Sequence, residues 1–350
     1  MNYFNFCKTC IGSAPHKNKD GILKEILNKF REIPFWPQLP KRNFLENMYV
    51  QFAENLPGCV IDEKSCKIYI DREKDFSEAL EKAFQKYIDG DLDFFSISKE
   101  YAEGFYGLLD KKNEISNNRE LKCLKGHVTG PISFGLTIKD NTGKSILYFK
   151  EFEELLPKFL SMKARWQIKK LKALCDDVII FIDEPYLTSI GSSFVNIDKD
   201  KTLSAIREVS SSIKDEGALS GLHCCGNTEW DFVLNSGIDI ISFDAYNFTK
   251  EFLLYHEAIG KFLNRGGVIA WGIVPTSSED LKKANTNALI KKVTDAIKQL
   301  DAKGMDKKEI IRSSIVTPSC GCGSLTEEEC GKIFQMLEEV AHTLRTKYRT

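Results

Sequence analysis

The chain alternates between short, nearly continuous apolar runs and longer stretches with helical periodicity. From residue 121 onward six apolar runs are expected to be strands: Leu121–Gly130, Val178–Pro185, Leu219–Gly226, Ile238–Ala245, Gly266–Pro275 and Ser313–Gly321. Helical patterns separate them, among them Phe149–Cys175, Lys201–Lys214, Ser278–Leu300 and Thr326–Arg345. Apolar strands that alternate with helices are typical of a parallel sheet covered by helices.

The first 120 residues are less regular. Lys8–Asn18 predicts a short strand that breaks at Gly12-Ser13, and Ile33–Pro40 holds three prolines, which limits it to a short strand or a mouth segment. Further expected elements are a hairpin over Cys59–Asp71 and helices over Asp20–Arg31, Asn43–Leu56, Phe76–Tyr87 and Ser98–Leu109. With the early strands counted, the sequence predicts an α/β fold, a single (β/α)₈ TIM barrel that forms one domain over residues 1–350.

Composition narrows the function classes. The 350 residues carry 49 Lys and Arg against 50 Asp and Glu, a net charge of −1, so neither a nucleic-acid partner nor an anionic membrane is expected. No apolar run is long enough for a transmembrane helix, and Met1–Cys10 lacks the features of a signal peptide. We therefore expect a cytoplasmic protein, in which the 11 cysteines are free thiols or metal ligands.

One stretch combines an imidazole with thiols. In Gly221–Asn227 (GLHCCGN), strand alternation puts His223 and Cys225 on one face and Cys224 on the other. Imidazole and thiolates favour Zn²⁺, and three protein ligands with an open fourth position are typical of a catalytic zinc site. The late segment TPSCGCG offers Cys320 as third ligand, with Cys322 as the alternative. The competing interpretation is a set of inert buried cysteines and a core histidine.

Other predicted strands also end in polar residues, where a barrel carries its active site. Asp183, at the end of VIIFID, is either a substrate-binding carboxylate or, with Glu184, part of a capping pair. Asp244 is either a fourth, oxygen ligand of the metal or a helix cap. The turn Thr129–Pro131 contains Gly130, which would let the backbone approach a ligand closely.

Five motifs occur in order along nearly the whole chain. They are IGS-x-P at Ile11–Pro15, KGHVTGP at Lys125–Pro131, IDEP at Ile182–Pro185, H-x-C at His223–Cys225 and TPSCG at Thr317–Gly321. Together they resemble the superfamily of cobalamin-independent methionine synthase, zinc-dependent coenzyme M methyltransferases and uroporphyrinogen decarboxylase. The resemblance implies a (β/α)₈ barrel with zinc held by His223, Cys225 and Cys320. It also implies that Gly12, Ser13 and Asp183 hold the carboxylate and amine of an amino-acid substrate.

Two departures bear on the reaction. Methionine synthases carry a Glu near the end of the second strand and a His after the seventh, whereas this chain has Gln38–Pro40 and Trp271–Pro275 there. The chain also lacks their duplicated N-terminal barrel, which favours a methylcorrinoid over folate as methyl donor.

The resemblance therefore implies a zinc-dependent methyltransferase that moves a methyl group from a methylcorrinoid or methylcorrinoid protein to a small thiol such as homocysteine. Asp183 and Asp244 are its candidate catalytic residues. The alternatives are a methylcorrinoid:coenzyme M-type methyltransferase, a uroporphyrinogen decarboxylase-like tetrapyrrole enzyme, and a non-catalytic barrel that stores zinc and binds a corrinoid protein. Decarboxylases of the superfamily lack the His and Cys set, which argues against that branch.

Overall fold

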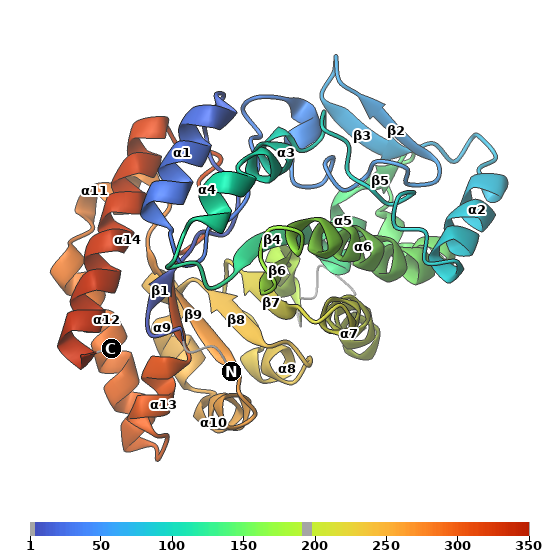
Figure 1. The fold of residues 1–350 in the computed structure, drawn as a ribbon. Coiled ribbons are helices and arrows are strands. Elements are labelled where there is room, and N and C mark those ends of the chain that lie inside the picture. The colour runs from blue at the N-terminus through green and yellow to red at the C-terminus, as the bar shows by residue number, and fades with distance from the viewer. Residues whose placement is uncertain (1–3, 191–197, 350) are drawn as a thin grey trace.

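The computed structural model describes residues 4–190 and 198–349. Within them the main sheet has seven parallel strands in the order β1-β10-β9-β8-β7-β6-β4, curled and surrounded by helices (Figure 1). The strands are β1 (Cys7–Lys8), β4 (Leu124–Thr129), β6 (Val178–Asp183), β7 (Leu219–Cys224), β8 (Ile240–Phe243), β9 (Val268–Val274) and β10 (Ser314–Pro318). The predicted α/β class is confirmed, and each of the six apolar runs contains one of these strands.

Helices follow the predicted periodic stretches. The long ones are α1 (Lys19–Lys29), α6 (Lys150–Leu171), α7 (Lys199–Asp215), α12 (Thr286–Ala302) and α14 (Glu327–Tyr348). Shorter ones are α5 (Pro131–Thr137), α8 (Trp230–Leu234), α9 (Ala245–Leu253), α10 (His256–Asn264), α11 (Ser278–Lys283) and α13 (Lys307–Arg312). The predicted helix Ser278–Leu300 is divided, because Asn285 leaves the helical conformation and its side chain caps α12.

Strand alternation divides the core into an outer and an inner part. Ile180 and Ile182 of β6 pack with residues of α6 and α7, outside the sheet. Phe181 lies on the other face, in a separate cluster with residues of β1, β8, β9 and β10, such as Ile240 and Ile315. This inner cluster fills the space enclosed by the curled sheet, as the side chains of a barrel do.

The proline-rich segment Ile33–Pro40 accounts for the difference between seven strands and the predicted eight. Phe35 forms a single parallel bridge with Lys125 of β4, and Gln38 forms one with Ser13, just after β1. Prolines 34, 37 and 40 have no N–H to donate, so a continuous ladder cannot form. Eight complete strands are therefore not present in the described part of the chain, although this segment reaches both edges of the sheet.

Residues between this segment and β4 lie beside the sheet. The predicted hairpin is confirmed, with β2 (Cys59–Asp62) antiparallel to β3 (Lys67–Ile70), and β5 (Lys139–Asp140) extends it. Further helices here are α2 (Ser77–Ile88), α3 (Glu103–Asp110) and α4 (Lys112–Ser116).

The predicted helix Asn43–Leu56 is wrong. Only the 3₁₀ turn η1 (Phe44–Glu46) forms, because the Asn43 and Asn47 side chains accept the N–H groups of Leu45 and Tyr49 and favour local turns. The two remaining 3₁₀ turns of the described residues are η2 (Ile146–Tyr148) and η3 (Pro185–Ser189).

The two ends of the sequence meet in the sheet. Strand β1 pairs with β10, so the blue N-terminal segment lies against the red C-terminal one (Figure 1). This pairing brings Gly12 and Ser13 to the loop that follows β10, which contains Cys320. In the described residues no helix is both long and apolar enough to cross a membrane.

Candidate metal centre

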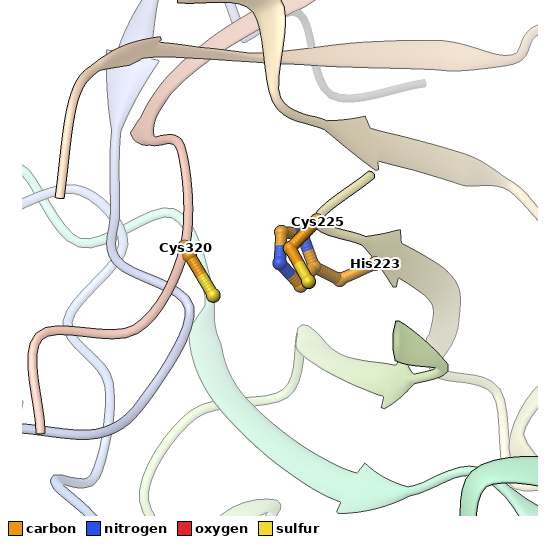
Figure 2. A group of neighbouring side chains, drawn as sticks. All are labelled: His223, Cys225 and Cys320. Carbon is orange, nitrogen blue, oxygen red and sulfur yellow. The ribbon is translucent and has the colours of Figure 1, made fainter. Parts of the chain in front are cut away.

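Three predicted ligands come together at the carboxyl ends of the strands. His223 lies in β7, Cys225 follows its end, and Cys320 lies in the loop after β10. The ligand atoms of the three all lie within 4.8 Å of one another, the only such group of three in the described residues. Figure 2 shows the side chains directed into a common space, with Cys320 approaching from its own segment.

The two other candidate thiols point elsewhere. Cys224 is buried in the outer core and its Sγ donates to the carbonyl of Gly226 at 3.5 Å, as strand alternation predicted. Cys322 is also buried in that core, where its thiol contacts Cys330. The structure therefore places Cys320, and not Cys322, beside His223 and Cys225.

The His223 ring is held by a neighbouring strand. Its Nδ1 lies 3.0 Å from the hydroxyl of Ser242, its register partner on β8, while Nε2 is buried and has no partner. Burial, and then the charge of Lys125, lowers the pKa of His223 to about 3, so the imidazole is neutral. In the tautomer whose Nδ1–H donates to Ser242, Nε2 keeps a free lone pair, the form in which histidine binds a metal.

The two thiols are coupled. The neighbouring Cys320 thiol lowers the pKa of Cys225 to about 7, and the same interaction, together with burial, raises the pKa of Cys320 well above its usual value. Of the two neighbouring thiols, Cys225 is thus the one that ionises more readily. Such a pair readily becomes two thiolates when a cation takes the proton's place.

The donor set fits zinc. Zn–S bonds of about 2.3 Å and Zn–N bonds of about 2.0–2.1 Å put the ligand atoms of a tetrahedral site roughly 3.4–3.8 Å apart. Atoms that already lie within 4.8 Å need only small side-chain movements to reach this geometry. Nε2 of His223 and the two sulfurs would thus supply three corners of a tetrahedral zinc site, which leaves the fourth corner to another ligand.

Asp183 lies directly beside this group. It is the last residue of β6 and the register partner of His223, and its buried Oδ1 has no hydrogen-bond partner. Burial raises the pKa of Asp183, and the ammonium of Lys125 opposes that shift. Lys125 is fully buried, donates to the carbonyl of Ile11 at 2.5 Å and lies over the Phe181 ring. Asp183 therefore keeps an acceptor free for a ligand, as its predicted substrate-binding role requires.

Glu184 has the capping role that was the alternative for the pair. Its carboxylate accepts from the backbone N–H groups of Ile132 and Ser133, at 2.9 and 2.8 Å, and from the Ser133 hydroxyl at 2.6 Å. A Cβ at Gly130 would lie 2.2 Å from this carboxylate. Gly130 thus leaves space for the Glu184 carboxylate, whereas the sequence analysis expected it to leave space for a ligand.

Asp244 makes the contacts of a helix cap. One carboxylate oxygen accepts from the Asn247 N–H at 2.9 Å and the other from the Asn247 side-chain amide at 2.7 Å, at the start of α9. It does not belong to the group of facing ligand atoms found in the described residues. Its contacts match the capping alternative, and its predicted catalytic role gains no support from them.

Ser13 contacts the third ligand's loop, and Gly12 packs against His127. The Ser13 hydroxyl accepts from the Gly323 N–H at 3.1 Å, and the Ser13 carbonyl accepts from the Cys322 N–H at 3.0 Å. A Cβ at Gly12 would lie 2.6 Å from Nδ1 of His127, so only glycine fits against this ring.

Sequence reasoning missed Ser242 and Lys125 as neighbours of the centre, and the unpartnered ring of His127 on β4. Both ring nitrogens of His127 are buried without a partner, and the ring stacks on Trp36 with centroids 3.9 Å apart. Period-two alternation in KGHVTG would have placed Lys125 and His127 on one face. Ser242 gave no signal, because its role depends on the pairing of β7 with β8.

Comparison with known proteins supports the fold. No family model and no curated protein matches the sequence. The structure of a putative vitamin-B12-independent methionine synthase from Listeria monocytogenes superposes with a TM-score of 0.56 at 14% identity, covering 94% of this chain and 86% of that one.

Two other structures superpose less well. A B12-independent methionine synthase from Shewanella sp. W3-18-1 gives a TM-score of 0.47 at 17% identity, covering 69% of this chain and 67% of that one. The pneumococcal virulence factor StrH gives 0.46 at 12% identity, with 97% and 84% covered. Scores below 0.5 do not establish a shared fold, so these two structures carry no argument. The score of 0.56 shows that the chain shares its fold with the Listeria protein.

Proposed function

We propose that this protein is a zinc-dependent methyltransferase that methylates a small thiol and belongs to the methionine synthase-like superfamily. The observation that carries the proposal is the group of His223, Cys225 and Cys320, whose ligand atoms face one another within 4.8 Å at the carboxyl ends of the strands. The fold shared with a methionine synthase-like structure agrees with it. We also infer that Ile33–Pro40 takes the place of the second of eight barrel strands, since it bridges to both β4 and the segment after β1.

The chemistry follows from the donor set. Zn²⁺ held by one imidazole and two thiolates would deprotonate a substrate thiol at neutral pH and so supply the nucleophile. Ser242 contacts Nδ1 of His223 and so orients the ring, which is itself buried. The sulfur would then attack the carbon of an activated methyl group, and the donor would leave with the bonding electron pair.

Homocysteine is the proposed acceptor. The free Oδ1 of Asp183 suits an ammonium group. The Ser13 hydroxyl accepts one hydrogen bond and can still donate its proton to a carboxylate. The second candidate is a thiol with a sulfonate in place of the amino acid, as in coenzyme M, but it would leave Asp183 without a partner.

A methylcorrinoid is the proposed donor. A reduced corrinoid leaves without a proton, whereas the departing nitrogen of a folate requires one. Trp271 is buried and its N–H donates to Ser314, and the following residues Gly272–Pro275 have no side chain that could serve as an acid. A corrinoid protein would then be the partner that presents the methyl group.

Metal analysis tests whether His223, Cys225 and Cys320 bind zinc. We expect about one zinc per chain in the wild type and nearly none in His223→Ala, Cys225→Ser or Cys320→Ser. Cys224→Ser and Cys322→Ser are matched controls that should keep the metal, because both thiols point into the core. A metal-free wild-type protein would favour the decarboxylase-like alternative. Loss of zinc in Cys322→Ser, with zinc retained in Cys320→Ser, would show that Cys322 and not Cys320 is the third ligand.

Turnover with defined methyl donors tests the proposed methylcorrinoid donor. We expect the zinc-loaded protein to demethylate methylcobalamin in the presence of homocysteine. The loss of the methyl–cobalt absorption band measures this reaction. Methyltetrahydrofolate alone should give no methionine. Methionine formed from the folate without any corrinoid would overturn the proposed donor and leave the zinc site untouched.

A further inference from the structure

The loop that carries Cys320 is attached to the N-terminal segment by backbone and side-chain contacts. The Cys322 N–H donates to the carbonyl of Ser13 at 3.0 Å, and the Gly323 N–H donates to its hydroxyl at 3.1 Å. One residue near the start of the chain thus binds two successive amides of the loop, which lies some three hundred positions further along.

Glycine at positions 321 and 323 leaves the space that this contact requires. A Cβ at Gly321 would lie 2.2 Å from the Ser13 hydroxyl oxygen, far closer than any real contact. At Gly323 a Cβ would lie 3.1 Å from the Cβ and Oγ of Ser13 and 2.8 Å from Pro40. The loop and Ser13 therefore fit together without space for one further methyl group, which restricts where Cys320 can lie.

The other two ligands have a different support. His223 lies within the ladder between β7 and β8 and contacts Ser242, and Cys225 directly follows the last residue of β7. Cys320 comes two residues after the end of β10, where the ladder with β9 has already shifted register at Thr317 and Pro318. Ser319 still donates its N–H to the Val274 carbonyl of β9 at 2.8 Å, and the next backbone hydrogen bond of the loop is the one from Cys322 to Ser13. The position of Cys320 is therefore set between the end of the sheet and the contact with Ser13.

We propose that Ser13 is a positioning residue for the metal centre, which clamps the loop Cys320–Gly323 so that the third thiol faces His223 and Cys225. The expected effect on metal affinity rests on the proposed zinc function. The contact between Ser13 and the loop does not depend on it. It gives Ser13 a role besides its predicted contact with a substrate carboxylate.

Two measurements test it. The first is Co²⁺ affinity, determined against a chelator, together with the thiolate-to-cobalt charge-transfer band. Residues that orient metal ligands typically change metal affinity about 10–100-fold when they are mutated. We expect Ser13→Ala to lower Co²⁺ affinity about tenfold or more and to weaken the band. Ser277→Ala is the matched control, since its hydroxyl also accepts a backbone N–H at 3.1 Å, at the start of α11.

The second measurement needs no metal. Hydrogen exchange in the metal-free protein should become several-fold faster in a peptide containing Cys320–Gly323 when Ser13 is replaced by Ala, and should stay unchanged elsewhere. A wild type that binds no metal, combined with this faster exchange, would refute the zinc proposal and keep the clamp. Wild-type exchange and wild-type Co²⁺ affinity in Ser13→Ala would refute the clamp and keep the zinc proposal.

A double-mutant cycle makes the contact specific. Gly321→Ala alone should weaken Co²⁺ binding, because its Cβ collides with the Ser13 hydroxyl. In the double variant Ser13→Ala/Gly321→Ala that oxygen is absent, and the two Cβ atoms lie 3.4 Å apart, an ordinary contact. We therefore expect the double variant to bind Co²⁺ more tightly than Gly321→Ala. Strictly additive losses would contradict a direct clamp.

Discussion

At the scale of single residues, some of the buried polar atoms without a partner belong to the centre or to the strands beside it. His223 Nε2, Asp183 Oδ1 and both nitrogens of His127 are such atoms, all on strands β4, β6 and β7. Leaving a buried polar atom unpaired costs about 1–3 kcal/mol, so native proteins accept it mainly where a ligand will bind. Asp183 and Glu184 illustrate the distinction, since only Glu184 has its full set of hydrogen bonds.

Asp183→Asn tests whether the free oxygen serves a substrate ammonium. The variant should weaken homocysteine binding by about 1–3 kcal/mol, because a charge-assisted hydrogen bond is replaced by a neutral one. Titration of the cobalt-substituted protein with homocysteine and with mercaptoethanesulfonate measures the effect. The thiol without an amine should bind Asp183→Asn and wild type alike, and equal losses for both thiols would assign Asp183 a structural role.

At the scale of elements, helix α5 depends on a residue from another strand. Glu184 follows β6 and supplies hydrogen bonds to the first turn of α5, which has no capping side chain of its own. A carboxylate at a helix N-terminus is favoured both by these bonds and by the helix dipole. The contact joins two neighbouring strand ends at the mouth of the sheet.

Glu184→Ala should therefore destabilise the protein by about 2–4 kcal/mol, since a fully buried, charge-assisted network is lost and three donors are left unpaired. Urea unfolding of the metal-free protein measures this change. Glu184→Gln keeps one acceptor oxygen and the same shape, so its loss should be smaller. An alanine variant as stable as wild type would show that α5 does not need this cap.

At the scale of the whole molecule, burial of a charge outside the centre makes stability depend on pH. Lys163 of α6 is fully buried, and burial lowers its pKa to about 7 from 10.5. Its ammonium lies 3.4 Å from the Ser96 carbonyl, the one hydrogen bond found for it in the described residues. Between these two pKa values the unfolded chain binds the proton more strongly than the folded protein does, so folding is opposed as pH falls from about 10 to 7.

Lys163→Met should remove this dependence. At pH 7 the variant is expected to be more stable than wild type by about 1–4 kcal/mol, and the difference should shrink as pH rises toward 10. Urea unfolding of both proteins at several pH values measures the difference, in which the titration of other groups cancels. Lys170→Met, on the exposed face of the same helix, should show no such trend. A difference that grows with pH would contradict the assignment.

The sequence by itself determined the elements and the ligand types. Apolar runs located β4 and β6–β10 because buried parallel strands need side chains that are apolar on both faces. Strand alternation was sufficient to separate His223 and Cys225 from Cys224, because that distinction is local to one strand. Local reasoning failed at Asn43–Leu56, where asparagine side chains compete for the backbone.

Only the tertiary structure decided between alternatives that join distant segments. Cys320 and Cys322 share one loop in sequence, and it is the pairing of β1 with β10 and the contacts of Ser13 that turn Cys320 toward the centre. Likewise Asp183 and Glu184 are neighbours, but the position of α5 makes one a cap and leaves the other free. Such choices depend on which surfaces meet after folding, and the pattern along a single chain does not contain that information.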